Sequence, residues 1–200
     1  MAHRVFGSKF EEALLFALQI HGCDLRKGTS IPYISHLLGV CALVMESGGD
    51  EDEAIAALLH DSLEDHPEEV TRSDLDHLFG THVADIVARC TDTLPDYKGG
   101  PKSPWRERKA AYVERLGSEL YPRCRVSLAD KLHNLRTIVM DYRQIGDAIW
   151  ARFNASKVDQ LRYFRALVEA FRNAQAPEHL LAELDSLVKE LGTDSEWESS

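Results

Sequence analysis

The chain of 200 residues is long enough for one domain to bury a substantial core without disulfides. Its 44% hydrophobic and 28% charged residues are ordinary for a globular protein, and its formal net charge of -10 argues against general binding to nucleic acid or anionic membranes. An anionic substrate is not excluded, because a cation and a few basic side chains can reverse the sign within one cleft.

Apolar residues recur at helical spacing almost throughout the chain, and no stretch shows the sustained alternation that a half-buried strand requires. The pattern predicts helices over 7–21, 35–47, 50–65, 72–79, 81–92, 104–120, 122–143, 154–173 and 177–191. Glycines and prolines mark the breaks, and the run TLPDYKGGPKSP (93–104) is the longest predicted loop, exposed and mobile. We expect one all-α domain over 1–192, followed by an acidic tail over 193–200.

The four cysteines stand singly and form no CxxC pair, which indicates reduced, mostly buried thiols rather than a zinc ribbon or a redox motif. The apolar stretch 13–20 follows two glutamates and has no cleavage signal, so it predicts an amphipathic helix and not a signal peptide. No apolar run approaches the length that crosses a bilayer. We therefore expect a cytoplasmic protein without a membrane partner.

The most informative segment is AIAALLHDSLEDH (54–66), in which an apolar helix leads into His60 and Asp61. Glu64 and Asp65 follow one turn later, so helical spacing places His60 near Glu64 and Asp61 near Asp65. A polar cluster beside so many leucines would be costly to bury without a cation or dense hydrogen bonding. The alternative is an exposed acidic helix end, and this segment alone does not decide between the two.

Two further segments add polar residues to apolar helices. IPYISHLLGV places His36 at a helix start, and VSLADKLHNL places Asp130 among apolar neighbours. Taken singly, His36 is more typical of a core or capping histidine, and Asp130 of a carboxylate paired with an arginine or a helix end. With His60 and Asp61 they supply two imidazoles and two carboxylates from three helices, a set that suits a catalytic transition metal better than a closed structural zinc site.

The order His36, His60-Asp61, Asp130 resembles the H…HD…D pattern of HD-domain phosphohydrolases. The strings RKGTSIPYISH, ALLHDSLED and LADKLHNLR resemble more narrowly the hydrolase half of RelA/SpoT proteins and the small alarmone hydrolases. The resemblance covers roughly residues 10 to 170. It implies an HD-fold helical bundle that removes the 3′-pyrophosphate from (p)ppGpp, a purine nucleotide, usually with manganese.

Carried over residue by residue, the resemblance makes His36, His60, Asp61 and Asp130 the metal ligands. The acidic pair that follows the HD dipeptide matches the family's carboxylates that position or deprotonate the attacking water. That pair consists of Glu64 and Asp65.

The resemblance also implies substrate contacts. Arg26 matches an arginine that stacks on the purine, and Lys27 lies beside it for phosphate. Asn134 and Thr137 match positions near the ribose and phosphate, and steps of four and then three from Asp130 keep them on its helical face. Three further basic residues are candidates for stabilising phosphate charge, although a solvated helix face explains at least one of them better: Arg106, Arg108 and Lys109. We expect the other histidines, including His21 and His66, to be surface or structural residues.

The chain departs from the family in several places. Between Arg26 and His36 it has one residue more than the common bifunctional pattern, so residues 28–30 do not align securely. Leu37 follows His36 where proline is common, and SPWRERKAAY differs from the long enzymes although its ERK core recurs among small hydrolases. These departures leave open which purine base the protein prefers. They bear less on the type of reaction.

Two other functions remain open at this stage. An HD enzyme could act on another nucleotide, such as an adenine alarmone, a 5′-nucleotide or a cyclic dinucleotide. A non-catalytic HD module could bind a nucleotide and signal through a partner, although it would have no need of a water-activating Glu64–Asp65 pair. The oligomeric state cannot be inferred from these patterns.

Overall fold

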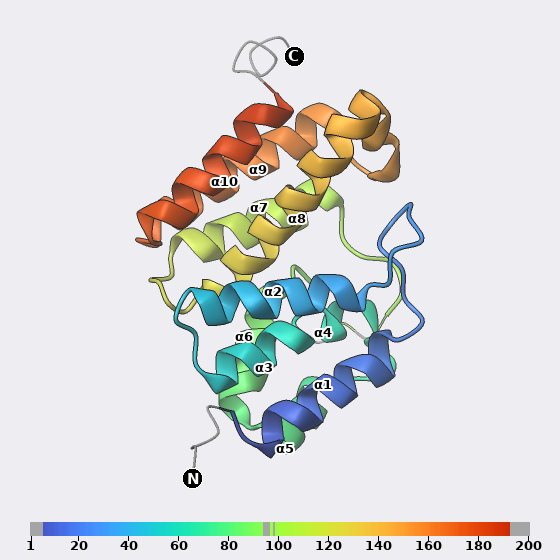
Figure 1. The fold of residues 1–200 in the computed structure, drawn as a ribbon, viewed down its shortest axis with the longest axis vertical. Coiled ribbons are helices and arrows are strands. Elements are labelled where there is room, and N and C mark those ends of the chain that lie inside the picture. The colour runs from blue at the N-terminus through green and yellow to red at the C-terminus, as the bar shows by residue number, and fades with distance from the viewer. Residues whose placement is uncertain (1–5, 94–96, 98, 193–200) are drawn as a thin grey trace. The chain divides into compact units, whose positions relative to one another are not determined.

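The computed structural model of the chain describes residues 6–93, 97 and 99–192 (Figure 1). These residues form helices and contain no β-strand, apart from one isolated antiparallel bridge between Leu25 and Pro32. The prediction of an all-α fold is therefore confirmed. The acidic tail predicted over 193–200 lies outside the described residues.

The chain divides into two compact units. The first comprises residues 1–102 and 125–130, and the second comprises 103–124 and 131–200, so that the long helix α8 contributes to both. The first unit contains α1 (Ser8–His21), α2 (Ile34–Glu46), α3 (Glu51–Leu59), α4 (Ser62–Asp65), α5 (Arg72–Phe79), α6 (Thr81–Cys90) and the start of α8 (Arg125–Ile145). The second contains α7 (Trp105–Gly117), the rest of α8, the 3-10 helix η1 (Gly146–Arg152), α9 (Lys157–Asn173) and α10 (Glu178–Leu191). One domain over 1–192 stays a prediction.

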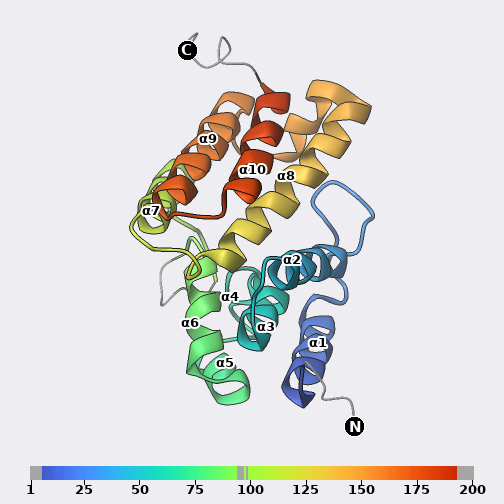
Figure 2. The ribbon, with the colours of Figure 1, turned by 60° about the vertical axis from the view of Figure 1, so that its left-hand side comes forward.

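Helix α3 forms the centre of the first unit, where it packs against α1, α2 and α6 (Figures 1 and 2). After a charged first turn, every residue from Ala54 to Leu59 is buried. Three of these six are alanines, whose small side chains let neighbouring helices approach closely. A reciprocal capping box between Asp50 and Glu53 begins the helix. The sequence therefore builds a rigid, buried helix that ends directly at His60.

The start of α8 is fixed to the start of α3 within the same unit. Arg125 forms an ion pair with Glu53, whose carboxylate also belongs to the capping box, and donates to the Gly48 carbonyl at 2.9 Å. Gly49 lies so close to Val44 that a Cβ there would be 2.5 Å from a Val44 methyl group, so only glycine fits. These contacts set the register of the α8 turn that carries Asp130.

In the second unit, α9 packs against both α7 and α10 (Figure 2). Its apolar residues recur every three or four positions and are buried: Leu161, Phe164, Leu167, Val168 and Phe171. Two ion pairs, spaced two helical turns apart, link α8 to α10. Arg136 contacts Glu183 and Arg143 contacts Glu190, each at 2.6 Å. Because these pairs are partly exposed, each stabilises the unit only slightly.

The structure differs from the predicted helices in one helix that is divided, in one additional short helix, and in several ends that shift by up to three residues. The helix predicted over 50–65 is two helices, α3 and α4, separated at 60–61, and the helix predicted from 122 begins at Arg125. Gly146, with a φ of 56°, ends α8, and the unpredicted η1 follows it. All four cysteines are free, and three of them are buried, as predicted. Among the described residues, no helix combines the length and the hydropathy that a membrane span requires.

Candidate metal centre

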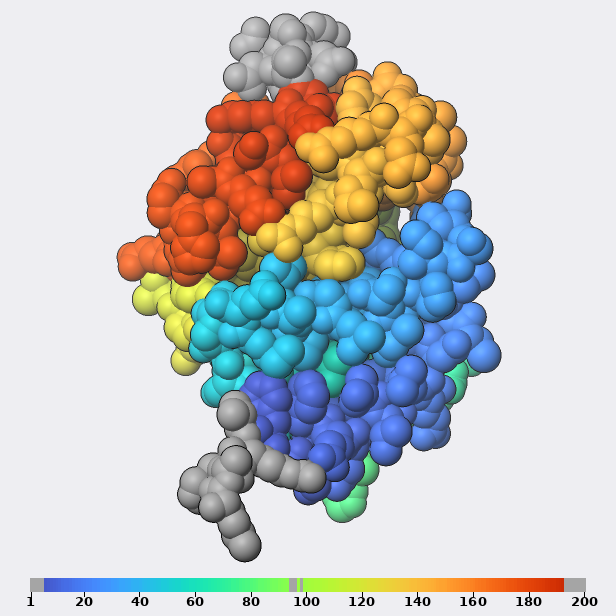
Figure 3. Space-filling model, viewed as in Figure 1, coloured from blue at the N-terminus to red at the C-terminus, as the bar shows by residue number. Residues whose placement is uncertain are grey.

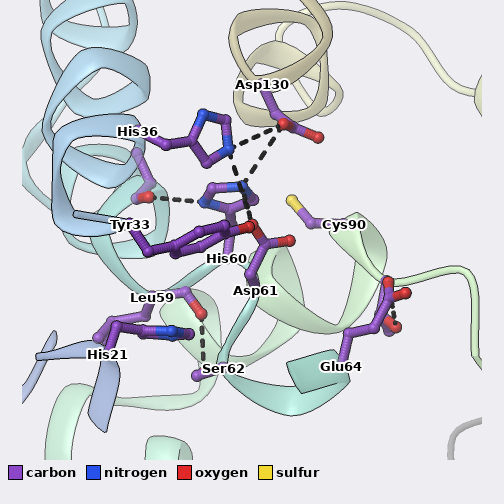
Figure 4. Close-up of polar contacts among 12 residues, drawn as sticks. His21, Tyr33, His36, Leu59, His60, Asp61, Ser62, Glu64, Cys90 and Asp130 are labelled. Atoms are coloured by element: carbon purple, nitrogen blue, oxygen red, sulfur yellow. Dashed lines mark hydrogen bonds and ion pairs between the residues drawn. The ribbon is translucent and has the colours of Figure 1, made fainter. Parts of the chain in front are cut away.

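The HD dipeptide occupies the break between α3 and α4 (Figure 4). Consecutive residues inside a regular helix point about 100° apart, yet at this break His60 Nε2 and Asp61 Oδ2 lie 2.9 Å from each other. Side chains stabilise it: Ser62 Oγ donates to the Leu59 carbonyl at 2.7 Å, and His60 Nδ1 lies 2.9 Å from the Ala57 carbonyl. The prediction of one continuous helix was wrong here: His60 and Asp61 separate α3 from α4, although their backbone angles stay in the αR region.

The four predicted ligands converge in the first unit (Figure 4). His60 Nε2 lies 2.9 Å from Asp61 Oδ2 and 3.6 Å from Asp130 Oδ1. His36 Nε2, on α2, lies 3.2 Å from the same Asp130 oxygen and 3.7 Å from Asp61 Oδ2. Both imidazoles are fully buried, and the Asp130 side chain is 5% exposed. The structure therefore brings together, from α2, the α3–α4 break and α8, the residues that the sequence singles out.

The arrangement fits a divalent cation. The coordinating atoms of His36, His60 and Asp130 all lie within 4.8 Å of one another. His60 Nδ1 is positioned to donate its proton to the Ala57 carbonyl, which leaves the Nε2 lone pair directed at the cluster. Although Nε2 is close to two carboxylates, its contacts do not have hydrogen-bond geometry among the described residues. A neutral imidazole nitrogen and carboxylate oxygens this close together could share one metal ion.

Burial and charge oppose each other in this cluster. Burial would lower the pKa of His60, but the Asp61 and Asp130 carboxylates outweigh it and raise that pKa well above the usual value. Burial dominates at His36 and lowers its pKa. Burial opposes ionisation of Asp61, yet the neighbouring His60 lowers the Asp61 pKa below its ordinary range. The carboxylates of Asp61 and Asp130 thus favour positive charge between them, which a proton or a metal ion can supply.

Tyr33 is a member of the site that sequence reasoning missed. Its hydroxyl donates to Asp61 Oδ2 at 2.5 Å, and its ring stacks on His21 and meets the His36 ring edge-on (Figure 4). The sequence does contain a signal for this role. Tyr33 precedes His36 by three residues at the start of α2, and that spacing places both side chains on the same face of the helix. Tyr33 thereby orients the Asp61 oxygen that lies 2.9 Å from His60 Nε2 and 3.7 Å from His36 Nε2.

Glu64 and Asp65 both lie on α4, one turn after the HD dipeptide, and their backbone amides donate to the Asp61 carbonyl. Glu64 Oε1 accepts a hydrogen bond from Lys102 Nζ at 2.9 Å. Desolvation and repulsion from Asp61 and Glu64 raise the pKa of Asp65 to about 7. Since Asp65 as a residue is exposed, repulsion among the clustered carboxylates is the firmer cause. The acidic pair therefore adjoins the metal cluster.

The predicted substrate contacts fall into both units. The loop between α1 and α2 lies on the surface (Figure 3). It carries Arg26, whose guanidinium is 5.7 Å from the centre of the Tyr33 ring. Lys27 is exposed beside it. Asn134 and Thr137 belong to the second unit, in which Thr137 Oγ1 donates to the Asn134 carbonyl at 2.9 Å. The structure thus places Arg26 against the metal-centre tyrosine, and the roles of the other three stay predictions.

The three other basic candidates all lie in the second unit. Arg106 is paired with Asp159 at 2.9 Å, Arg108 donates to the Ser103 carbonyl at 3.0 Å, and Lys109 lies over the Tyr163 ring. These contacts give each side chain a structural role within its own unit.

A second polar cluster was also missed. His21, Asp24 and His66 lie together in the first unit, with the two histidines on either side of the aspartate. Sequence analysis assigned both histidines a surface or structural role, although His66 sits beside the HD motif. Their proximity depends on the approach of α1 to α4, which no local spacing shows.

Comparison with known proteins agrees with this geometry. The family model described as HD domain matches residues 13–161. The GTP pyrophosphokinase rsh of Brucella ovis is 34% identical over 133 residues, which are 64% of this chain but 16% of that protein, so the chain spans about a sixth of it. The guanosine-3′,5′-bis(diphosphate) 3′-pyrophosphohydrolase MESH1 of Xenopus tropicalis is 39% identical over 137 residues, 64% of this chain and 68% of that protein.

A solved structure agrees as well. A metazoan ortholog of SpoT, described as hydrolyzing ppGpp, matches with a TM-score of 0.74 and 26% identity over 96% of this chain and 99% of that one. The resemblance seen in the three sequence strings is thereby confirmed. With a family match over most of its length and the H…HD…D residues gathered in one cluster, the chain belongs to the HD-domain family and is homologous to MESH1.

Proposed function

We propose that the protein is a metal-dependent hydrolase that removes the 3′-pyrophosphate of (p)ppGpp-type alarmones, giving GDP or GTP and pyrophosphate. The observation that carries the proposal is the buried cluster of two imidazoles and two carboxylates with an acidic pair one turn away. The homologous MESH1 bears the name of this activity. A module that only binds a nucleotide has no use for such a pair.

The residues that would hold the ion are His36, His60, Asp61 and Asp130. Their mixed nitrogen and oxygen donors suit a divalent transition metal, and we propose Mn²⁺. When bound, such an ion lowers the pKa of a coordinated water and neutralises phosphate oxygens. Tyr33 holds Asp61 Oδ2 in position, and the Ala57 carbonyl holds the His60 ring.

Glu64 and Asp65 have different roles toward the attacking water. Glu64 accepts hydrogen bonds from Lys102 and, at 3.4 Å, from Thr91. The described residues donate no side-chain hydrogen bond to Asp65, so its carboxylate is available to accept a proton. We therefore assign proton transfer to an Asp65 carboxylate oxygen and orientation to Glu64.

Substrate is held at the surface loop. Arg26, positioned over the Tyr33 ring, is suited to stack on the purine, and Lys27 to contact phosphate. Asn134 and Thr137 would contact the ribose and phosphate region, because they share the α8 face of Asp130. A cytoplasmic location and the absence of nucleic-acid binding stay predictions from charge and cysteine content.

One experiment tests the proposal. Manganese-loaded protein is incubated with guanosine and adenosine tetraphosphates, GTP and nucleoside monophosphates, and the products are identified by mass. We expect guanosine tetraphosphate to give GDP with intact pyrophosphate. Orthophosphate as the main product, or equal turnover of substrates that lack the 3′-pyrophosphate, would indicate a general nucleotidase. A faster reaction with the adenine analogue would overturn only the base preference, and no turnover at all would support the binding module.

The matched control is Asp61→Ala. It should lose activity and the manganese ion held by His36, His60 and Asp130, because Asp61 contacts both imidazoles. A variant that keeps its full metal content would show that the ligand set is wrong.

A further inference from the structure

Three residues outside the cluster of His36, His60, Asp61 and Asp130 (the HD cluster) lie close together in the first unit. His21 is the last residue of α1, Asp24 follows in the loop, and His66 follows α4. Asp24 Oδ2 lies 2.8 Å from His21 Nδ1 and 2.7 Å from His66 Nε2. The two rings meet edge to face, with their centres 4.7 Å apart. One carboxylate oxygen thus stands between two imidazole nitrogens.

The donor set is suited to a metal ion. One coordinating atom from each of the three residues lies within 4.8 Å of the other two, and the set is two nitrogens and one oxygen. The other ring nitrogen of His66 contacts Glu69 Oε1 at 3.1 Å, which is the carboxylate–histidine arrangement that orients a metal-binding imidazole. The His21 side chain is fully buried, whereas that of Asp24 is 33% exposed, so solvent reaches one side of the cluster.

The charge of the cluster also favours a cation. Asp24 and Glu69 contribute two carboxylates, and no lysine or arginine among the described residues pairs with either. Burial lowers the pKa of His21, which keeps this imidazole in the neutral form that binds metals. Burial alone would lower the pKa of His66, but its contacts with Asp24 and Glu69 outweigh burial and raise that pKa. The same two carboxylates that favour a proton there would favour a divalent ion.

We propose that His21, Asp24 and His66 form a second metal site, which takes a divalent transition-metal ion, best matched by Zn²⁺, with water completing the coordination. The ion joins the end of α1, the loop that carries Arg26 and the residue after α4. Its role is structural, and its existence does not depend on the proposed hydrolase activity.

The experiment measures zinc per chain. Metal-free protein is equilibrated with Zn²⁺, freed of unbound ion by desalting, and analysed for metal content. His66→Gln keeps an amide that can hydrogen-bond Asp24 but removes the imidazole, so we expect it to hold one zinc ion fewer than the wild type. His77→Gln, at an exposed histidine of α5, is the matched control and should hold as much zinc as the wild type. Cys23→Ser should also be unchanged, since the exposed Cys23 thiol is not part of the site.

Cobalt identifies which site is occupied. Asp61→Ala, which disables the HD cluster, should still bind one Co²⁺ with the visible absorption of a low-coordinate nitrogen–oxygen site, and Asp61→Ala/His66→Gln should lose it. Equal zinc in wild type and His66→Gln, or no cobalt in Asp61→Ala, would overturn the second site and leave the cluster as a hydrogen-bonded tether. One zinc in wild type and none in His66→Gln would support this site while contradicting the predicted HD ligands.

Discussion

Replacing Tyr33 by phenylalanine isolates one hydrogen bond of the metal centre. The hydroxyl donates to Asp61 Oδ2 at 2.5 Å, while the ring contacts with His21 and His36 do not require it. A hydrogen bond to a charged group contributes about 1.5–3 kcal/mol, and loss of an outer partner of a metal ligand typically weakens metal binding about 10- to 100-fold. Freed from Tyr33, Asp61 also becomes more basic, which favours the ion. We expect the loss of orientation to dominate and the affinity to fall by about 10-fold or more.

The assay is a competition titration of Mn²⁺ against a fluorescent chelator. It is carried out in a His66→Gln background, so that the second site does not contribute. Tyr163→Phe is the control, because the buried Tyr163 hydroxyl makes no hydrogen bond in the described part of the chain and lies in the second unit. Unchanged thermal unfolding of metal-free Tyr33→Phe would show that the fold is intact. Manganese affinity equal to that of the Tyr163→Phe control, or tighter, would refute the assignment of Tyr33 as a positioning residue.

Three further outcomes are expected. Glu64→Gln and Asp65→Asn should keep the metal yet lower turnover on the order of a hundredfold or more, as measured by metal analysis and initial rates; normal rates in both would remove their role in water activation. Arg26→Ala should weaken substrate binding by roughly 1–3 kcal/mol in a calorimetric titration and leave the metal in place, whereas unchanged binding would exclude stacking on the base. Asp50→Ala should lower the free energy of unfolding by about 1 kcal/mol through loss of the α3 cap, and a denaturant midpoint equal to that of wild type would contradict this.

The sequence predicts the helices well because each buries an apolar stripe whose period is visible locally. The cluster of His36, His60, Asp61 and Asp130 was predicted from polar residues in apolar helices taken together with the family resemblance, since each segment alone also allows a core or capping role. The break at 60–61 was not predicted, since it depends on side chains of Ser62 and His60 that bond backbone carbonyls. Periodicity alone favours continuing the helix through such a short interruption.

Other parts of the site depend on tertiary proximity. Tyr33 meets Asp61 across 28 positions of the chain, and His66 meets Asp24 across 42. The ion pair of Arg125 with Glu53 links positions that are 72 apart. No periodic pattern encodes such pairs, because each requires two helices to be already packed.

The predicted ligands come from three separate elements, namely α2, the α3–α4 break and α8. This has a thermodynamic consequence. An ion that needs all three elements binds the native chain and not the unfolded one, so metal binding and folding are linked equilibria. Free metal at about 100 times its dissociation constant would add about 2.7 kcal/mol to the free energy of unfolding. The native fraction of the protein would then rise and fall with the metal supply of the cell, even where no substrate is present.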